Sequence, residues 1–105
     1  MENAVAALGA LAQETRLAVF RLLVRVGPGG LAAGEIARRM DLPAATLSFH
    51  LSQLSHTGLI AATRNGRSIR YAADYEVMGG LMDFLQDNCC QEARPARDRQ
   101  PGAPA

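Results

Sequence analysis

Apolar residues recur along most of the chain at the three- and four-residue spacing that is typical of amphipathic helices. The pattern predicts helices at residues 3–12, 15–26, 33–40, 44–57 and 75–89. A Gly-Pro-Gly-Gly run at 27–30 stops the second helix, and residues 41–43 form a short turn between the third and fourth helices. In the fourth helix Leu47, Leu51 and Leu54 share one face, which we expect to pack on the core.

The segment after the fourth helix has the pattern of a β-hairpin. Residues 59–64 and 67–73 are strand-like, and Asn65-Gly66 between them is the dipeptide typical of a type I′ turn. A very short strand is expected at residues 31–32. The order helix, helix, short strand, helix, turn, helix, hairpin and helix predicts a mainly α fold of the winged helix-turn-helix type, in which the hairpin is the wing.

Length and composition are those of one small helical domain. The chain has 105 residues, of which 49% are apolar and only 5% aromatic. We assign residues 1–90 to one winged helix-turn-helix domain, and residues 91–105, which are rich in proline, to a disordered tail. Neither a transmembrane run nor a secretory signal is recognisable, so we expect a cytoplasmic protein with reduced cysteines and no membrane partner.

The fourth helix carries the candidate DNA contacts on the face opposite its leucines. Hydroxyl, amide and imidazole groups suit phosphates and base edges in the major groove. The predicted contacts are Thr46, Ser48, His50, Ser52 and Gln53. An ordinary solvated helix surface has a similar composition, and only the hairpin that follows favours the DNA-binding interpretation.

Charge distribution supports the same interpretation although the formal net charge is only +1. No acidic residue lies between Asp41 and Asp74, whereas Arg64 and Arg67 flank the tip of the wing. These two arginines are predicted to attract the phosphate backbone or to reach a minor groove. Arg70 lies further along the strand and is interpreted as structural.

These segments resemble the ArsR/SmtB-type metalloregulatory repressors over residues 5–90. The matching residues are Leu-Ala-Gln-Glu-Thr-Arg-Leu at 11–17, Thr-Leu-Ser-Phe-His-Leu-Ser-Gln-Leu at 46–54, Gly-Leu-Ile at 58–60, and then Arg64, Gly66 and Tyr71. The resemblance implies a homodimer built on the first and last helices. It also implies binding to double-stranded operator DNA without any cofactor, and release when a metal or metalloid effector binds.

Members of this family place their effector sites differently, and two of the arrangements do not fit this chain. Residues 31–36 contain no cysteine, and the last helix has carboxylates but no histidine. The vicinal pair Cys89 and Cys90 resembles the site of arsenic-responsive members, which usually have a third cysteine that is absent here. The resemblance therefore implies arsenic(III) or antimony(III) as effector, because both prefer thiolate sulfur. A third ligand would be solvent, a partner's cysteine, or the carbon of a methylated arsenic(III).

Other interpretations of the cysteine pair remain open. Cys89 and Cys90 could form a thiol-redox sensor in a repressor of the same fold, or Cys89 could pack as a small apolar residue. A protein-interaction module with a winged helix is a further alternative. A thiol enzyme fits poorly, since the chain has no Cys-x-x-Cys, no cysteine with an obvious activating histidine and no phosphate loop. We therefore expect a regulator and not an enzyme.

Overall fold

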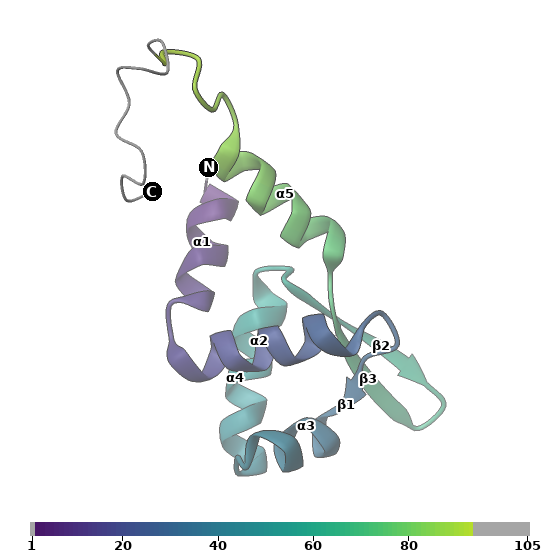
Figure 1. Cartoon of the computed structure of the whole chain (residues 1–105). Coiled ribbons are helices and arrows are strands. Elements are labelled where there is room, and N and C mark those ends of the chain that lie inside the picture. The colour runs from purple at the N-terminus through teal and green to yellow at the C-terminus, as the bar shows by residue number, and fades with distance from the viewer. Residues whose placement is uncertain (1, 94–105) are drawn as a thin grey trace.

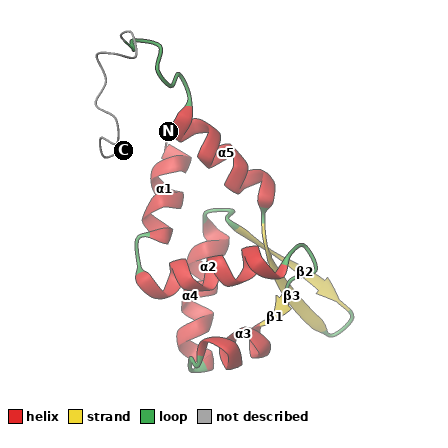
Figure 2. Cartoon of the chain, in the orientation of Figure 1, coloured by secondary structure: helices red, strands yellow, loops and turns green. Residues whose placement is uncertain are grey.

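The computed structural model describes residues 2–93 and confirms the mainly α winged helix-turn-helix fold. Its elements, in chain order, are α1 (Glu2–Leu11), α2 (Glu14–Val26), β1 (Leu31–Ala32), α3 (Ala33–Met40), α4 (Ala44–His56), β2 (Ile60–Asn65), β3 (Ser68–Ala73) and α5 (Tyr75–Gln86). A small antiparallel sheet lies at one side of the helices (Figure 2). None of the helices in this part of the chain is long and apolar enough to cross a membrane.

Local side-chain and backbone geometry explains where the helices begin and end. The Gln13 side chain caps α2 by accepting a hydrogen bond of 2.8 Å from the backbone N–H of Arg16. The Asp74 carboxylate caps α5 in the same way, by accepting bonds of 3.1 Å from the N–H groups of Glu76 and Val77. Asp41, in the left-handed conformation with a φ of 55°, ends α3.

The core lies where α1, α2, α3 and α4 meet the sheet. Its largest fully buried side chains are Leu23, Ile36, Leu47, Leu54, Leu59 and Val19. At the other end of the molecule α1 and α5 lean on each other, and the hairpin projects from the side (Figure 1). The helix-turn-helix pair α3 and α4 is therefore held rigidly by the core, whereas α5 touches the domain with one side only.

The three strands pair in the order β1-β3-β2, and their register corrects the predicted turn. Asn65 pairs with Ser68, so the two central turn residues are Gly66 and Arg67 and not Asn65 and Gly66. Gly66 has a φ of 67°, whereas Arg67 is not among the residues with positive φ. A type I′ turn needs positive φ at both positions, so the prediction of that turn type was wrong, and the pattern is that of type II′.

The C-terminal end of the predicted last helix is also corrected. The prediction extended it to residue 89, but α5 ends at Gln86 and residues 87–92 form turns. Asn88 and Cys90 have positive φ values of 60° and 68°, which an α-helix does not accommodate. Most of the predicted disordered tail, residues 94–105, lies outside the described residues, and the division of the chain at residue 90 stays a prediction.

Candidate nucleic-acid interface

The fourth helix separates its apolar and polar sides as the sequence pattern predicts. Leu47, Leu51 and Leu54 are buried and tie α4 to α2, α3 and the sheet. On the opposite side Thr46, Ser48, Ser52 and Gln53 are all exposed, together with Ala45, Phe49 and His56. We refer to these seven exposed residues as the recognition face of α4. Their donors and acceptors are thus available to a ligand outside the domain.

His50 is the exception among the predicted contacts. Its side chain is only 8% exposed, so the prediction that it faces DNA was wrong. Burial, and then the positive charge of Arg16, lower the pKa of His50 below its usual value of 6.5. Its Nδ1 has no hydrogen-bond partner within the described part of the chain. His50 therefore lies on the buried side of α4 and is not part of the recognition face.

The start of α4 adds backbone donors to the recognition face. Pro43 occupies the N-cap position and has no side-chain acceptor to cap the first N–H groups of the helix. Such N–H groups, with the positive end of the helix dipole, are suited to a phosphate oxygen. Thr46 in the same turn adds a hydroxyl. The first turn of α4 thus has the chemistry of a backbone-phosphate contact.

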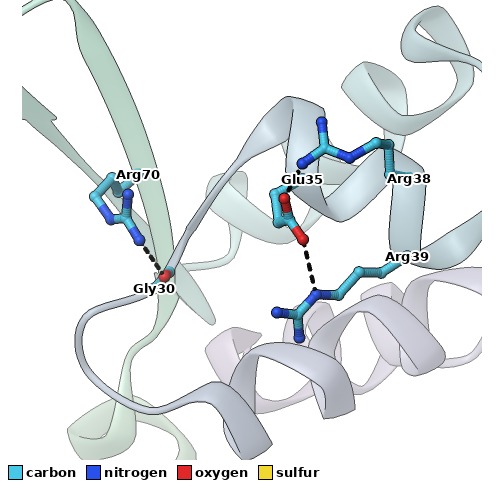
Figure 3. Close-up of polar contacts among 5 residues, drawn as sticks. All are labelled: Gly30, Glu35, Arg38, Arg39 and Arg70. Carbon is cyan, nitrogen blue, oxygen red and sulfur yellow. Dashed lines mark hydrogen bonds and ion pairs between the residues drawn. The ribbon is translucent and has the colours of Figure 1, made fainter.

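The wing carries two exposed arginines and one that anchors it. Arg64 pairs with Ile69 across the hairpin, and Arg67 lies in the turn itself. Arg70 instead turns back toward the loop before β1, where it donates a hydrogen bond of 2.9 Å to the carbonyl of Gly30 (Figure 3). A second bond of 3.0 Å goes to the carbonyl of Gly29. This confirms the structural interpretation of Arg70 and leaves Arg64 and Arg67 as the cationic side chains of the tip.

Gly30 allows this loop to lie against the sheet. It has a φ of 68°, and a Cβ on it would collide with the backbone carbonyl of Tyr71 in β3. Only glycine fits there, since a side chain would both strain the backbone and push β3 away. The anchored loop and Arg70 together fix the angle at which the wing leaves the domain.

Helix α3 contributes arginines that the sequence analysis did not include. Arg38 and Arg39 both pair with Glu35 on the exposed side of α3 (Figure 3). The i, i+3 and i, i+4 spacing from Glu35 is a signal for this pairing in the sequence. Arg38 stays well exposed despite the ion pair. Two arginines share one carboxylate here, so this exposed side of α3, the helix that packs against α4, keeps a net positive charge.

The cysteine pair lies away from this surface, beyond the end of α5. Cys89 and Cys90 are both exposed, and the backbone N–H of Cys89 donates a 2.9 Å bond to the carbonyl of Gln86. Within residues 2–93 no group of three or more His, Cys, Asp or Glu side chains is placed to hold a metal ion. The described part of one chain therefore supplies two adjacent thiols and no ready third ligand from these residue types.

Apolar side chains remain exposed on the two terminal helices. Leu85 is 58% exposed and Val5 62%, and α5 has no buried residue along its whole length. Leu8, Met82 and Phe84 add to this surface, which we call the terminal-helix face. Several apolar side chains exposed on adjoining helices are typical of a protein contact surface.

Comparisons with known proteins agree with this geometry. A helix-turn-helix domain model matches residues 11–62. The HTH-type transcriptional regulator CmtR of Mycobacterium tuberculosis is 40% identical over 87 residues, which are 81% of this chain and 71% of CmtR. Among solved structures, the homodimeric winged helix-turn-helix DNA-binding domain of Mb0332 from Mycobacterium bovis, a possible ArsR-family regulator, has a TM-score of 0.67 and 26% identity and covers 89% of this chain and 83% of its own.

A second solved structure points to the same family. The ArsR-like transcriptional regulator from Rhodococcus sp. RHA1 has a TM-score of 0.63 and 25% identity, with 90% of this chain and 95% of that one covered. The fold and the exposed face of α4 define a winged helix-turn-helix DNA-binding protein. The chain belongs to the HTH-type transcriptional regulators of the ArsR family.

Proposed function

We propose that this regulator is a homodimeric repressor that leaves its operator when trivalent arsenic or antimony binds to Cys89 and Cys90. The observation that carries the proposal is the position of two adjacent, exposed thiols shortly after α5, a helix that has no buried residue and exposes Met82, Phe84 and Leu85. An effector bound there can act on the contact between two chains without touching the DNA.

In this proposal DNA is bound by α4 and the wing and needs no cofactor. Ser48 and Gln53 of the recognition face read base edges, and Thr46 and Ser52 bind phosphate or base. Arg64 and Arg67 add attraction that is independent of sequence. The absence of acidic residues between Asp41 and Asp74 supports this arrangement, because no carboxylate in the recognition face or the wing repels the phosphates.

The dimer uses the terminal-helix face. The side chains of the terminal-helix face are exposed in a single chain, and a second copy with the same surface covers them by two-fold symmetry. Mb0332, which has the same fold, is a homodimeric DNA-binding domain. A dimer places two recognition helices in successive major grooves at a spacing that the α1 and α5 contact sets.

The sensor chemistry follows from the softness of sulfur and arsenic. Arsenous acid exchanges two hydroxides for the sulfurs of Cys89 and Cys90, and each thiol proton leaves with a hydroxide as water. One position on arsenic then remains. It is occupied by solvent, by a cysteine of the partner subunit, or by a methyl carbon already on the arsenic. If the arsenic carries a methyl group, the two sulfurs complete the site.

Release of DNA requires that the effector bind more tightly to one dimer arrangement than to the other. Because the cysteines follow α5 directly, a bound arsenic restricts the backbone at the end of a dimer helix. A small change in how the two α5 helices meet alters the distance between the two recognition helices. The effector thereby favours an arrangement whose spacing no longer fits the operator.

The test compares DNA binding by the wild type with that by Cys89→Ser and Cys90→Ser, on duplexes that the wild type selects from a random pool. Both variants are expected to bind DNA as the wild type does and to keep binding in arsenite, whereas the wild type is released. Gln91→Ser is the matched control, an exposed residue on the same turns that keeps both thiols. Release of both cysteine variants by arsenite would remove the pair from the sensor.

Two further measurements separate the remaining alternatives. Peroxide in place of arsenite tests the redox sensor, and release by peroxide but not by arsenite would replace metalloid binding with thiol oxidation. X-ray absorption on the arsenic-loaded dimer counts the sulfurs. Two per arsenic are expected, together with release by a monomethylated arsenic(III) at least as efficient as by arsenite. Three would assign the third ligand to the partner's cysteine.

A further inference from the structure

Phe49 stands out on the recognition face because it is its only large apolar side chain. It is 57% exposed, although it lies in the middle of a helix whose other side is fully buried. Its neighbours on the helix surface, three and four positions away, are the exposed residues Ala45, Thr46, Ser52 and Gln53. A ring of this size thus projects from a surface of small and polar groups.

The ring is supported from behind. Phe49 makes an edge-type contact with the buried imidazole of His50, with ring centroids 5.7 Å apart and an interplanar angle of 63°. His50 is itself buried on the inner side of α4. The exposed Phe49 ring therefore has one of its contacts with a side chain of the domain interior.

Phe49 does not belong to the terminal-helix face. Within the described residues, the other large exposed apolar side chains lie on α1, α2, β3 and α5. Phe49 alone among them lies on α4, on the side of that helix opposite its buried leucines. It also lies in the acid-free segment with Arg64 and Arg67. We therefore expect the Phe49 side chain to contact the nucleic acid and not a second copy of the chain.

The major groove offers one apolar group for such a side chain, the C5 methyl of thymine. Phenylalanine has no hydrogen-bonding atom, so it cannot read the donors and acceptors of the other bases. We propose that Phe49 packs against thymine methyl groups in the major groove and so selects T at one or two positions of each half-site. This inference rests on the proposed placement of α4 in the groove, and it adds a specificity residue that works by apolar contact.

The experiment replaces single thymines by deoxyuridine, which removes only the methyl group. The probes are duplexes selected by the wild type from a random pool, and affinity is measured by fluorescence anisotropy. At one or two thymines per half-site the replacement should weaken binding by the wild type about three- to tenfold, as expected for a lost buried methyl contact. Phe49→Ala should bind the thymine duplex more weakly by a similar factor and show no further loss on the deoxyuridine duplex.

Phe49→Leu is the matched variant, because it keeps an apolar side chain of smaller reach and should retain part of the methyl dependence. Since Phe49 is exposed, its replacement should leave the thermal unfolding temperature nearly unchanged, which checks that each variant folds. Equal sensitivity to deoxyuridine in the wild type and Phe49→Ala at every position would overturn the inference, as would no sensitivity in the wild type. Failure of the wild type to select any duplex would instead contradict the placement of α4 in the groove.

Discussion

Helices α4 and α5 are nearly equal in length, with 13 and 12 residues, and both carry apolar residues at helical spacing. They differ in how far the rest of the domain buries those residues. Leu47, Leu51 and Leu54 of α4 are buried, whereas α5 has no buried residue and exposes Met82 and Leu85. An apolar stripe thus predicts that a helix packs against some other surface. It does not predict whether that surface belongs to the same chain or to another one.

The physical reason is the number of elements around each helix. Helix α4 contacts α1, α2, α3 and β2, so its leucines are enclosed on all sides. Helix α5 follows the sheet at the edge of the domain and leans on α1 (Figure 1). A polar recognition face and an apolar terminal-helix face are therefore formed by different helices of one small molecule.

Truncation of a leucine should be costly on α4 and mild on α5. Leu54→Ala leaves a cavity at a side chain with no exposed surface and should lower the free energy of unfolding by about 2–5 kcal/mol. Leu85→Ala removes a side chain that is 58% exposed and should cost far less in a dilute, monomeric sample. Urea unfolding measures both. Equal losses for the two variants would show that α5 is as enclosed as α4.

A charge on the terminal-helix face should break the dimer and spare the fold. Leu85→Asp would bury an unpaired carboxylate in the contact between two chains. Because burying an unpaired charge costs more than about 1.4 kcal/mol, the dimer dissociation constant should rise at least about tenfold. Sedimentation measures the association, and circular dichroism checks that the helices remain. Gln86→Asp, at the next and already polar position, is the control. A Leu85→Asp protein that sediments as the wild type does would exclude this face as the interface.

The wing arginines should change the salt dependence of DNA binding more than its sequence preference. Arg67→Ala should weaken binding to all duplexes and reduce the slope of log affinity against log salt by about one, as for one phosphate contact. Arg64→Ala should act in the same way, and Arg21→Ala on the exposed side of α2 is the control. A double variant at 64 and 67 with the slope of the wild type would remove the wing from the DNA interface.

The smallest effect is expected from pH, through His50. Because burial and Arg16 lower the pKa of His50 in the folded protein, the unfolded chain takes up a proton first as pH falls below the ordinary value of 6.5. Stability should therefore be full above pH 6.5 and decline as pH falls through the lower folded pKa. His50→Gln should flatten this part of the profile, whereas His56→Gln, at an exposed position, should retain it. An identical profile in His50→Gln would assign the acid sensitivity to other groups.

The Asn65-Gly66 dipeptide correctly predicted a hairpin, but the central residues of its turn are Gly66 and Arg67. A two-residue turn at Asn65-Gly66 would put Arg64 directly opposite Arg67, and like charges at paired positions are destabilising. The observed register instead pairs Arg64 with Ile69 and joins the buried residues Ile60 and Ala73. Burial at the base of the ribbon and charge separation near its tip together outweigh the preference of the Asn-Gly dipeptide.

The sequence alone determined the features that depend on neighbours along the chain. The leucine stripe of α4, the bounds of α3 and the order of elements all follow from helical periodicity and glycine or proline stops. The fold class and most of the recognition face were predictable from these features. When one side of a surface helix packs on the core, its opposite side is left exposed. Four of the five residues predicted on α4 as DNA contacts, Thr46, Ser48, Ser52 and Gln53, are exposed accordingly.

Only the tertiary structure decided the features that depend on distant residues. His50 lies at the border of the α4 stripe, and it is buried in the folded chain, where the charge of Arg16, more than thirty residues earlier, also lowers its pKa. Arg70 leaves the wing surface because its partners, Gly29 and Gly30, are 41 and 40 positions away in the chain. Helical and strand periods describe one element at a time, whereas burial and long-range hydrogen bonds arise only when elements meet.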